Sequence, residues 1–533
     1  MESDAGVSAR SSASALPSSF LRIPPFPGAK VSEFASRPAD RDFDFERLTH
    51  MVRQERVGGT YWAAQPDLPQ NYVLTRISAP TAAAEVAGSN PVVTWDRDCD
   101  PWHMLARATA LIAERDDDAC AIAAILKVPV YTVGKDGVLE RLGVETTAAS
   151  LYRLGSATLV NPFTSAAMTV EEGVVLCGFW RRLIDSNRDL GGAVGFAFWK
   201  QANVAPLLWG GDRPVAFLTS VANFPPDRPV AAWLSKCPAA EVKSLADAGV
   251  PMVEVEDGFL RSHGLGADCV PPLSITVDRL GAYFDPQQPS ELENLLQGGS
   301  FNEEVLERAR QLRAVIVEAG LGKYEQGAAT LKRPAGERRH ILVPGQVEDD
   351  RSVITGGNGL SNLDLLKRVR QDAPEAYILY KPHPDVLAGH RKGAIEERAC
   401  LEFADKIVGS QSISSLIAMV DEVHVNTSLA GFEALMRDKA VTVWGAPFYA
   451  GWGLTRDKGA VPSRRTAKRS LDEVVAAALL LYPRYLDPQT GLPCPAEIVV
   501  ERLTNSAAEN VGAVVRLRRL HGKLMRRFRG VSR

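Results

Sequence analysis

Several features that would place this chain in a specialised class are missing from its sequence. The seven cysteines are scattered and include no Cys-x-x-Cys pair, which argues against both a disulfide framework and a zinc site. No apolar run approaches the roughly 20 residues that span a bilayer. The first residues, MESDAGVSAR, have no basic segment followed by an apolar core, so we expect no secretory signal. These absences predict a protein of a reducing cytoplasm.

The chain also lacks a strong charge of either sign. Its formal net charge is −3 over 533 residues, whereas a chain built as a whole to bind nucleic acid is strongly basic. Hydrophobic residues make up 45% and charged residues 23%, which is an ordinary globular mixture. The length predicts roughly two to four domains of about 100–200 residues each.

Short apolar strands alternate with helical patterns along most of the chain. We expect strands at 91–95, 128–134 and 174–179, and one helix over 101–114. A strongly amphipathic helix is expected over 301–320, where it would bridge two lobes. Alternating strands and helices imply parallel, Rossmann-type sheets, so the predicted fold class is α/β.

The chain contains an internal repeat. Residues 72–80 (YVLTRISAP) align with 377–385 (YILYKPHPD), and residues 105–134 align with 416–445 with one gap. One explanation is that any two Rossmann halves look alike. The other is a duplicated half-module that lost its ligand site, and two independent matches at similar spacing favour this second explanation.

A lysine and a histidine follow the strand that begins at Tyr377. Ligands of open α/β sheets sit at the carboxyl ends of strands, and Lys381 and His383 occupy such an end. Both side chains can donate to a phosphate, and Pro382 and Pro384 restrict the backbone around them. The alternative is a structural turn that carries a surface histidine.

Two hydroxyl residues, Thr427 and Ser428, stand where a second strand passes into a helix. Backbone N–H groups at a helix start bind anions, and the hydroxyls add donors. Simple capping of the helix is the alternative. In the aligned copy this position is acidic, at Asp116 to Asp118, and would repel phosphate. With the lysine and histidine in the same lobe, the hydroxyl pair predicts a nucleotide-phosphate site.

Two acidic clusters also follow strands. Glu348, Asp349 and Asp350 are consecutive in one lobe, and Glu256 and Asp257 end a strand in another. Facing lobes would bring the clusters together across a cleft. Paired carboxylates are the standard equipment of glycosyl transfer, in which one attacks or stabilises the anomeric carbon and the other handles a proton. The alternative is that both are solvated acidic loops.

The last 19 residues, 515–533, contain eight Lys or Arg and no acid. Apolar residues lie among the charges at partly helical spacing, which predicts a basic helix at a membrane interface. A disordered, solubilising tail is the alternative. The residues expected to meet the membrane are Arg516, Arg518, Arg519, Lys523, Arg526, Arg527 and Arg529.

Taken together, these motifs resemble the bacterial capsular polysaccharide β-Kdo glycosyltransferases of the KpsC type. The matching pieces run in the family's order from about 160 to 490. They include EDGFLRSHGLG, VPGQVEDD, YKPHPDV, TSLAGFEAL and PFYAGWGLT. The resemblance implies a GT-B-like pair of lobes and CMP-Kdo as donor, Kdo being 3-deoxy-D-manno-octulosonic acid. It also implies a retaining mechanism through a covalent glycosyl-enzyme, with transfer to a (lyso)phosphatidylglycerol-linked Kdo glycolipid.

The resemblance also assigns roles to residues. The last acid of the Q-x-x-x-D pattern is Asp350, the expected nucleophile, and the acid/base comes from Glu256 or Asp257. His383, beside Pro384, and Ser428 match the positions that hold the CMP phosphate, with Lys381 and Thr427 in support. Gln346 and Glu433 are weaker candidates for nucleotide contacts. We expect no cofactor and no metal.

Only one module looks complete, and it resembles the family's C-terminal module. We expect a disordered arm (1–40), a degenerate Rossmann-like lobe (41–150), an acceptor-side lobe with the acid/base motif (160–325), a CMP-sugar-binding lobe (326–485) and a C-terminal segment with the basic tail (486–533). The expected site of action is the inner face of the inner membrane, among other capsule assembly proteins and without nucleic acid. Two rival functions remain: a non-catalytic assembly or export scaffold, and a CDP-glycerol-type transferase.

Overall fold

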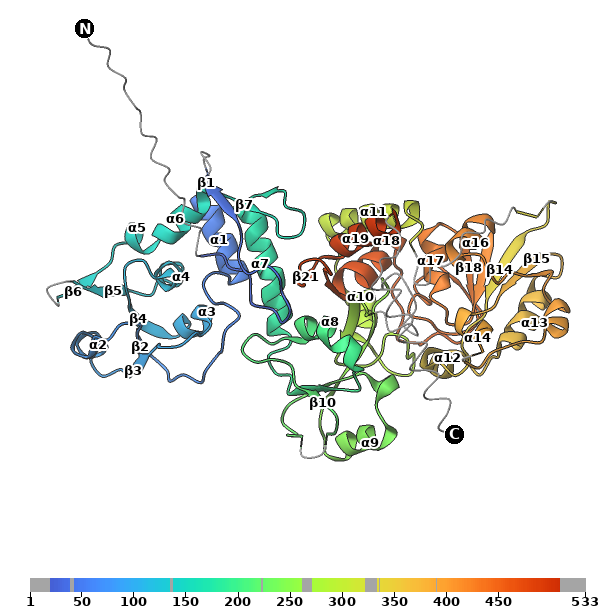
Figure 1. The fold of residues 1–533 in the computed structure, drawn as a ribbon, viewed down its shortest axis with the longest axis horizontal. Helices are drawn as coiled ribbons and strands as arrows, with labels where there is room; N and C mark the ends of the chain where they lie inside the picture. The colour runs from blue at the N-terminus through green and yellow to red at the C-terminus, as the bar shows by residue number, and fades with distance from the viewer. Residues whose placement is uncertain are drawn as a thin grey trace, which may run out of the picture. The chain divides into compact units, whose positions relative to one another are not determined.

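The chain folds into two compact units (Figure 1). Unit 1 comprises Met1–Asp189, Leu208–Pro214 and Gln489–Leu492, and unit 2 comprises Leu190–Leu207, Val215–Pro488 and Pro493–Arg533. This computed structural model describes residues 20–38, 43–134, 138–221, 224–260, 271–321, 333–334, 336–389 and 391–508, without the side chains of 506–508. Residues 1–19 of the expected arm (1–40) and the basic tail lie outside the described residues. The expectation of a disordered arm is wrong for residues 20–38, because Phe20, Ile23 and Phe26 are buried and Ser36–Pro38 form strand β1.

Unit 1 contains a five-stranded sheet with the order β3-β2-β4-β5-β6. Its strands are β2 (Tyr72–Thr75), β3 (Val92–Thr94), β4 (Ala108–Ile112), β5 (Val130–Val133) and β6 (Leu139–Arg141). The first four are parallel, and β6 runs antiparallel at the edge. Helices α2 (Pro80–Ala87), α3 (Pro101–Leu105) and α4 (Asp118–Leu126) connect them.

The helix predicted over 101–114 is wrong in its second half. Helix α3 ends at Leu105, and Ala108–Ile112 form strand β4 between β2 and β5. The alanines of this stretch favour a helix locally. Pairing on both sides with buried parallel strands overrides that preference, since a strand flanked on both sides satisfies all of its backbone hydrogen bonds in the sheet.

Unit 1 also contains a long helix, α7 (Val170–Asp185), where a strand was predicted at 174–179. Thr169 and Glu172 form a capping box at its start, a signal visible in the sequence as T-x-x-E. Helix α7 contacts α1 (Phe45–Glu55) and strand β7 (Ala157–Val160), which pairs with β1 (Ser36–Pro38) and β8 (Ala167–Met168). Its buried Arg181 donates to the carboxylate of Asp100 at 2.6 Å.

The first sheet of unit 2 has the order β10-β9-β11-β12-β13-β20-β21. Strands β9 (Gly192–Val194), β10 (Phe217–Leu218), β11 (Val230–Ala232) and β12 (Met252–Asp257) are parallel, and β13 (Ser274–Asp278), β20 (Arg484–Leu486) and β21 (Pro493–Cys494) are antiparallel to their neighbours. Helices α8 (Phe198–Leu208) and α9 (Ala239–Asp247) connect the parallel strands.

The second sheet of unit 2 is parallel, with the order β16-β15-β14-β17-β18-β19. Its strands are β14 (His340–Pro344), β15 (Tyr377–Lys381), β16 (Lys406–Ile407), β17 (Glu422–Val425), β18 (Ala440–Val443) and β19 (Arg456–Asp457). Strands β15 and β16 extend to one side of β14, and β17 to β19 extend to the other. The topological switch point, where ligands of open α/β sheets bind, is therefore between β14 and β17.

Helical segments connect the two sheets of unit 2. Helix α11 (Glu303–Glu318) lies within the predicted 301–320 and contacts α18 (Leu471–Val475), the π-helix Ala476–Leu481 and α19 (Ala496–Ala508). Arg313 of α11 donates to the carbonyl of Met436 in the second sheet's layer. After the π-helix, the chain returns to the first sheet as β20. Helix α11 is therefore confirmed as a helix between the two sheets in chain order.

The internal repeat is visible in the two parallel sheets. Strands β2, β3, β4 and β5 of unit 1 follow one another, with intervening helices, as β15, β16, β17 and β18 do in unit 2. The sheet orders differ at one place, because β2 pairs directly with β4 whereas β14 lies between β15 and β17. Unit 1 thus has no counterpart of β14 among its described residues, and β14 leads into the loop that carries Asp350.

Candidate functional site

The loops that follow β14 and β17 meet at the switch point through Gln346 and Thr427. The Gln346 Nε2 donates to Thr427 Oγ1, and the Thr427 backbone N–H donates to Gln346 Oε1, both at 2.9 Å. Asn362, in helix α13 (Asn362–Asp372), accepts from the Gln346 backbone N–H and donates to its carbonyl. Gln346 therefore holds the Thr427 loop in place and uses both ends of its amide to do so.

Asp350 is exposed and caps helix α12 (Arg351–Gly356), four residues after Gln346. Its Oδ1 accepts from the backbone N–H of Ser352 at 3.0 Å and from the Ser352 hydroxyl at 2.7 Å. These two bonds fix the direction of the carboxylate. The neighbouring Asp349 is also exposed but is paired with Arg391 at 3.1 Å.

Lys381 ends β15 and His383 lies in the turn that follows, and the two side chains have different partners. The buried Lys381 ammonium donates to the carbonyls of Gly409 (3.3 Å) and Gln411 (2.7 Å), so it holds the loop after β16, and burial lowers its pKa. His383 precedes the short helix α14 (Pro384–Leu387), and its Nδ1 accepts from the Asp385 backbone N–H at 3.2 Å. In the neutral ring this bond leaves the proton on Nε2.

Helix α17 (Ala430–Met436) follows β17; Ser428 lies just before this helix, and Glu433 lies within it. The Ser428 hydroxyl accepts from the Ala430 backbone N–H at 3.2 Å, and the Ser428 carbonyl accepts from the Tyr449 hydroxyl. Glu433 is buried. Burial and then the charge of Glu433 raise the pKa of Tyr449 well above its usual value.

The acidic cluster at the end of β12 reaches the Asp350 loop through an arginine. Arg351 directly follows Asp350, and its Nη1 contacts the carboxylates of Glu254 and, at 3.2 Å, Glu256. Burial and then the charge of Glu254 raise the pKa of Glu256 to about 8, while Arg351 opposes that rise. Facing lobes were expected to bring the two clusters together, and Arg351 is the residue that joins them.

Three functional candidates were missed in the sequence. Glu254 and Arg351 each flank a predicted acid by one or two positions, so a charge-pattern signal was present. Lys200 was not detectable, because it lies on α8, far along the chain from Asp257. Its buried ammonium is 3.2 Å from Asp257 Oδ1 and 3.3 Å from the centroid of the Trp233 ring.

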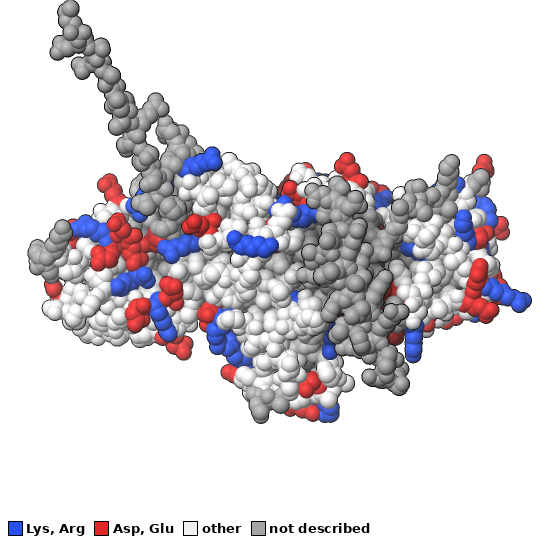
Figure 2. Space-filling view, viewed as in Figure 1, with Lys and Arg blue, Asp and Glu red and all other residues white. Residues whose placement is uncertain are grey.

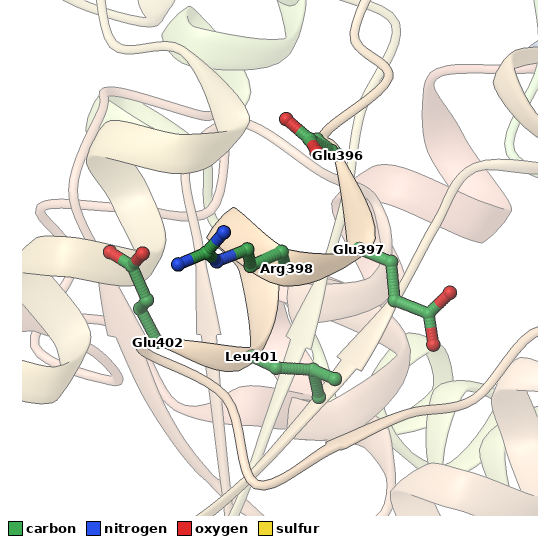
Figure 3. Close-up of a pocket in the computed structure, with 5 residues that line it drawn as sticks. All are labelled: Glu396, Glu397, Arg398, Leu401 and Glu402. Carbon is green, nitrogen blue, oxygen red and sulfur yellow. The ribbon is translucent and has the colours of Figure 1, made fainter.

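One hollow of the described surface lies away from the predicted residues. The hollow in Figure 3 is lined by Glu396, Glu397, Arg398, Leu401 and Glu402. These residues belong to or flank helix α15 (Glu397–Leu401), which precedes β16 at its amino end, whereas the predicted residues follow carboxyl ends of strands. On the face drawn in Figure 2, basic and acidic side chains are interspersed.

The described residues contain neither a cluster of metal ligands nor a helix that could span a membrane. No group of three or more His, Cys, Asp or Glu in that part of the chain is placed to hold a metal ion. Likewise, none of the helices described there is both long and apolar enough to cross a bilayer. The predicted tail residues, Arg516 to Arg529, lie outside this part.

Comparisons with known proteins agree with the motifs. A family described as capsule polysaccharide biosynthesis protein matches residues 229–485. The capsule polysaccharide modification protein LipA of Neisseria meningitidis serogroup A is 37% identical over 350 residues, which are 64% of this chain and 49% of LipA. The lipopolysaccharide-processing protein LpsZ of Rhizobium meliloti is 47% identical over 290 residues, which are 54% of this chain and 66% of LpsZ. The chain thus spans about half the length of LipA.

A solved structure is also similar. The Thermosulfurimonas dismutans KpsC β-Kdo 2,4 transferase superposes with a TM-score of 0.52 at 32% sequence identity, and the match covers 59% of this chain and 98% of that one. The similarity agrees with the two-sheet, mixed α/β architecture of unit 2. The chain has a GT-B-like α/β fold and belongs to the family of KpsC-type capsule polysaccharide biosynthesis proteins.

Proposed function

We propose that this protein is a retaining β-Kdo glycosyltransferase of capsule polysaccharide biosynthesis that uses CMP-Kdo as donor. The observation that carries the proposal is the position of Asp350 at the switch point, one residue from the arginine that contacts Glu254 and Glu256. Asp350 follows a strand of the second sheet and Glu256 lies on a strand of the first, and a pair of carboxylates suits a two-step glycosyl transfer in which one attacks the sugar and the other handles a proton. The similarity to the T. dismutans β-Kdo transferase supports the choice of sugar.

In the first step, Asp350 attacks the anomeric carbon of Kdo. A C–O bond forms to a carboxylate oxygen, and the bond to the CMP phosphate breaks with its electron pair leaving on the phosphate. Because Oδ1 already accepts two hydrogen bonds, we assign the attack to Oδ2. His383 and the hydroxyls of Thr427 and Ser428 are assigned to the phosphate, where they would stabilise the developing charge.

Lys381 and Gln346 are assigned indirect roles. Lys381 binds two carbonyls of the loop after β16, and Gln346 binds Thr427. Both therefore hold loops that frame the nucleotide and need not touch it. Glu433, buried in α17 near Tyr449, is assigned in the same way to the support of that helix.

In the second step, an acceptor hydroxyl displaces Asp350 with help from a base on β12. We propose a Kdo-bearing phosphatidylglycerol-type glycolipid as acceptor, at the inner face of the inner membrane. The basic sequence 515–533 would bring the enzyme there, because each Lys or Arg near an anionic surface contributes about 1 kcal/mol. A chain ending at residue 508 should then lose co-sedimentation with anionic vesicles; retained binding would contradict this role.

Trapping the sugar on residue 350 tests the proposal. The Asp350→Cys variant is incubated with CMP-Kdo and examined by intact-mass and peptide mass spectrometry. Asp349→Cys is the matched control, since it places a thiol one residue away on the same exposed loop. We expect one Kdo on the peptide of Asp350→Cys and none on that of Asp349→Cys.

Two other outcomes would contradict parts of the proposal. Absence of an adduct with CMP binding intact would remove Asp350 as the nucleophile. Absence of both adduct and CMP binding would remove CMP-Kdo as the donor. In that case CDP-glycerol is tested beside CMP-Kdo. A CDP-glycerol-type transferase would turn over CDP-glycerol, whereas a non-catalytic scaffold would bind neither nucleotide.

A further inference from the structure

Strand β12 directs its three acidic side chains to different places. Successive residues of a strand point to opposite faces, so Glu254 and Glu256 share one face and Asp257 lies on the other. The ladder with β13 continues through all three positions, since Glu254 is opposite Asp278, Glu256 is opposite Thr276 and Asp257 is opposite Ile275. The two acids predicted as alternatives are therefore not equivalent.

The face of β12 that carries Glu254 and Glu256 is turned toward the Asp350 loop. Both carboxylates contact the guanidinium of Arg351, which directly follows Asp350. The side chains of Glu254 and Glu256 are 11% and 15% exposed, so their environment is set by the protein more than by water. Glu256, nearer the carboxyl end of the strand, is the member of this pair closer to the open edge of the sheet.

Asp257, on the opposite face, is paired with Lys200. The Lys200 side chain is 8% exposed, its Nζ is 3.2 Å from Asp257 Oδ1, and the same Nζ lies 3.3 Å from the centroid of the Trp233 ring. A buried ammonium persists only where a carboxylate or an aromatic face compensates its charge. Lys200 has both, so this contact holds the Asp257 carboxylate on the face of β12 that is turned away from Arg351.

We propose, on the basis of the function proposed above, that Glu256 takes the proton of the acceptor and that Lys200 is a positioning residue that holds the Asp257 carboxylate on the other face of β12. In the second step the acceptor oxygen forms a bond to the anomeric carbon. The bond from that carbon to Asp350 breaks, and its electron pair returns to the Asp350 carboxylate. The proton of the acceptor hydroxyl passes to a carboxylate oxygen of Glu256.

The charged groups around Glu256 explain why it can do this near neutral pH. Burial, then Glu254, and also Asp257 raise its pKa, whereas Arg351 of α12 and Lys200 of α8 lower it, and the balance is about 8. On β13, the residue opposite Glu256 is the uncharged Thr276. The acid on β13 is Asp278, whose carboxylate accepts from the Tyr482 hydroxyl and from three backbone N–H groups. A base with a pKa near the working pH is effective because it is both available and basic.

The pH dependence of kcat/KM for the acceptor tests the inference, with CMP-Kdo and a phosphatidylglycerol analogue bearing one Kdo as substrates. For wild type we expect a rate that rises with pH and levels off above about 8. Glu256→Gln should lose this rise and roughly 10²–10⁴ in rate. Asp257→Asn should move the rise to lower pH and Lys200→Met to higher pH, because Asp257 raises and Lys200 lowers the pKa of Glu256. Lys200→Arg should restore the wild-type position.

Each contrary result has a distinct meaning. A rise that persists in Glu256→Gln and vanishes in Asp257→Asn would make Asp257 the base and overturn the inference. In Asp257→Asn and Lys200→Met, the rate could instead rise at the wild-type pH and reach only a lower plateau. That result would mean that Asp257 and Lys200 have a purely structural role, and it would also overturn the inference. Absence of Kdo transfer by wild type at every pH would instead overturn the proposed function on which the inference rests.

Discussion

The Gln346 side chain links the loops that follow β14 and β17 at the switch point. Its amide makes two hydrogen bonds of 2.9 Å with Thr427, and its backbone makes two more with Asn362. The position of Thr427 in the proposed phosphate site thus depends on a residue of another loop. A substitution that keeps the size of Gln346 but removes its polar end should leave the Thr427 N–H and hydroxyl without these partners.

We therefore predict that Gln346→Leu weakens CMP binding roughly tenfold, as measured by isothermal titration calorimetry. The size follows from an unsatisfied partner costing about 1–3 kcal/mol. Gln297→Leu is a matched control, because the Gln297 Nε2 also donates to a threonine hydroxyl, that of Thr466 at 2.8 Å, but α10 (Glu291–Gly298) follows the first sheet. Equal CMP affinity of Gln346→Leu and wild type would contradict the positioning role.

At the scale of elements, an ionic network joins strands β17, β18 and β19. The buried Glu422 accepts from His424 at 2.8 Å and from Thr442 at 2.6 Å, and Arg456 contacts it at 3.2 Å. Burial alone would raise the pKa of Glu422, but the bonds from His424 and Thr442 and the nearby cations outweigh it and lower the pKa to about 2. The network thus fixes β17, which leads to Thr427 and Ser428.

This network should make the fold sensitive to acid. Because the folded-state pKa of Glu422 lies below its unfolded value, the folded state binds fewer protons, and the stabilisation is complete above pH of about 5 and is lost as pH falls toward 2. We predict that Glu422→Gln lowers the free energy of unfolding by a few kcal/mol at pH 7, and that the difference from wild type shrinks below pH of about 4. Urea unfolding at several pH values measures it.

Glu402→Gln provides the control for this prediction. Glu402 is exposed beside α15 and is drawn in Figure 3. The same chemical change there should alter the free energy of unfolding by less than about 0.5 kcal/mol. A deficit of Glu422→Gln that is independent of pH would mean that packing, and not the charge, is what the network contributes.

At the scale of the whole molecule, the described residues of unit 1 form a mostly parallel sheet that has no strand corresponding to β14. The unit is nevertheless held together by buried charge, since Arg181 of α7 is 3% exposed and pairs with Asp100, which is fully buried. Arg181 also donates to the carbonyls of Arg56 and Tyr61. Arg56, Tyr61 and Asp100 precede residue 150, whereas α7 follows it, and of the acids paired with Arg181 only Asp185 lies in α7 itself.

A chain that lacks residues 1–150 should therefore lose solubility and thermal stability. Removing one partner of a buried ion pair typically costs 3–5 kcal/mol, and the cut would also expose the buried Val174, Cys177 and Trp180 of α7. Thermal unfolding and sedimentation of the truncated chain test this. A truncated protein that is as stable and as active as the full chain would show that unit 1 gives no such support.

Local signals in the sequence determined the strand ends and the chemistry that they carry. The prolines around His383, the hydroxyl pair at 427–428 and the acids at 256–257 and 348–350 are short patterns that need no distant contact to be seen. The alternation of strands and helices determined the α/β class, and the order of motifs pointed to the family. The same local view assigned 108–112 to a helix and 174–179 to a strand, because propensity says little about which strands will flank a segment.

Only the tertiary structure decided which of those residues meet. The joining of Glu256 to the Asp350 loop by Arg351, the capture of Lys381 by two carbonyls and the pairing of Asp257 with Lys200 all link positions far apart in the chain. Strand alternation then placed Glu256 and Asp257 on opposite faces. Burial and neighbouring charges act through distance in space, so the pKa of a carboxylate and its role cannot be obtained from its neighbours in sequence.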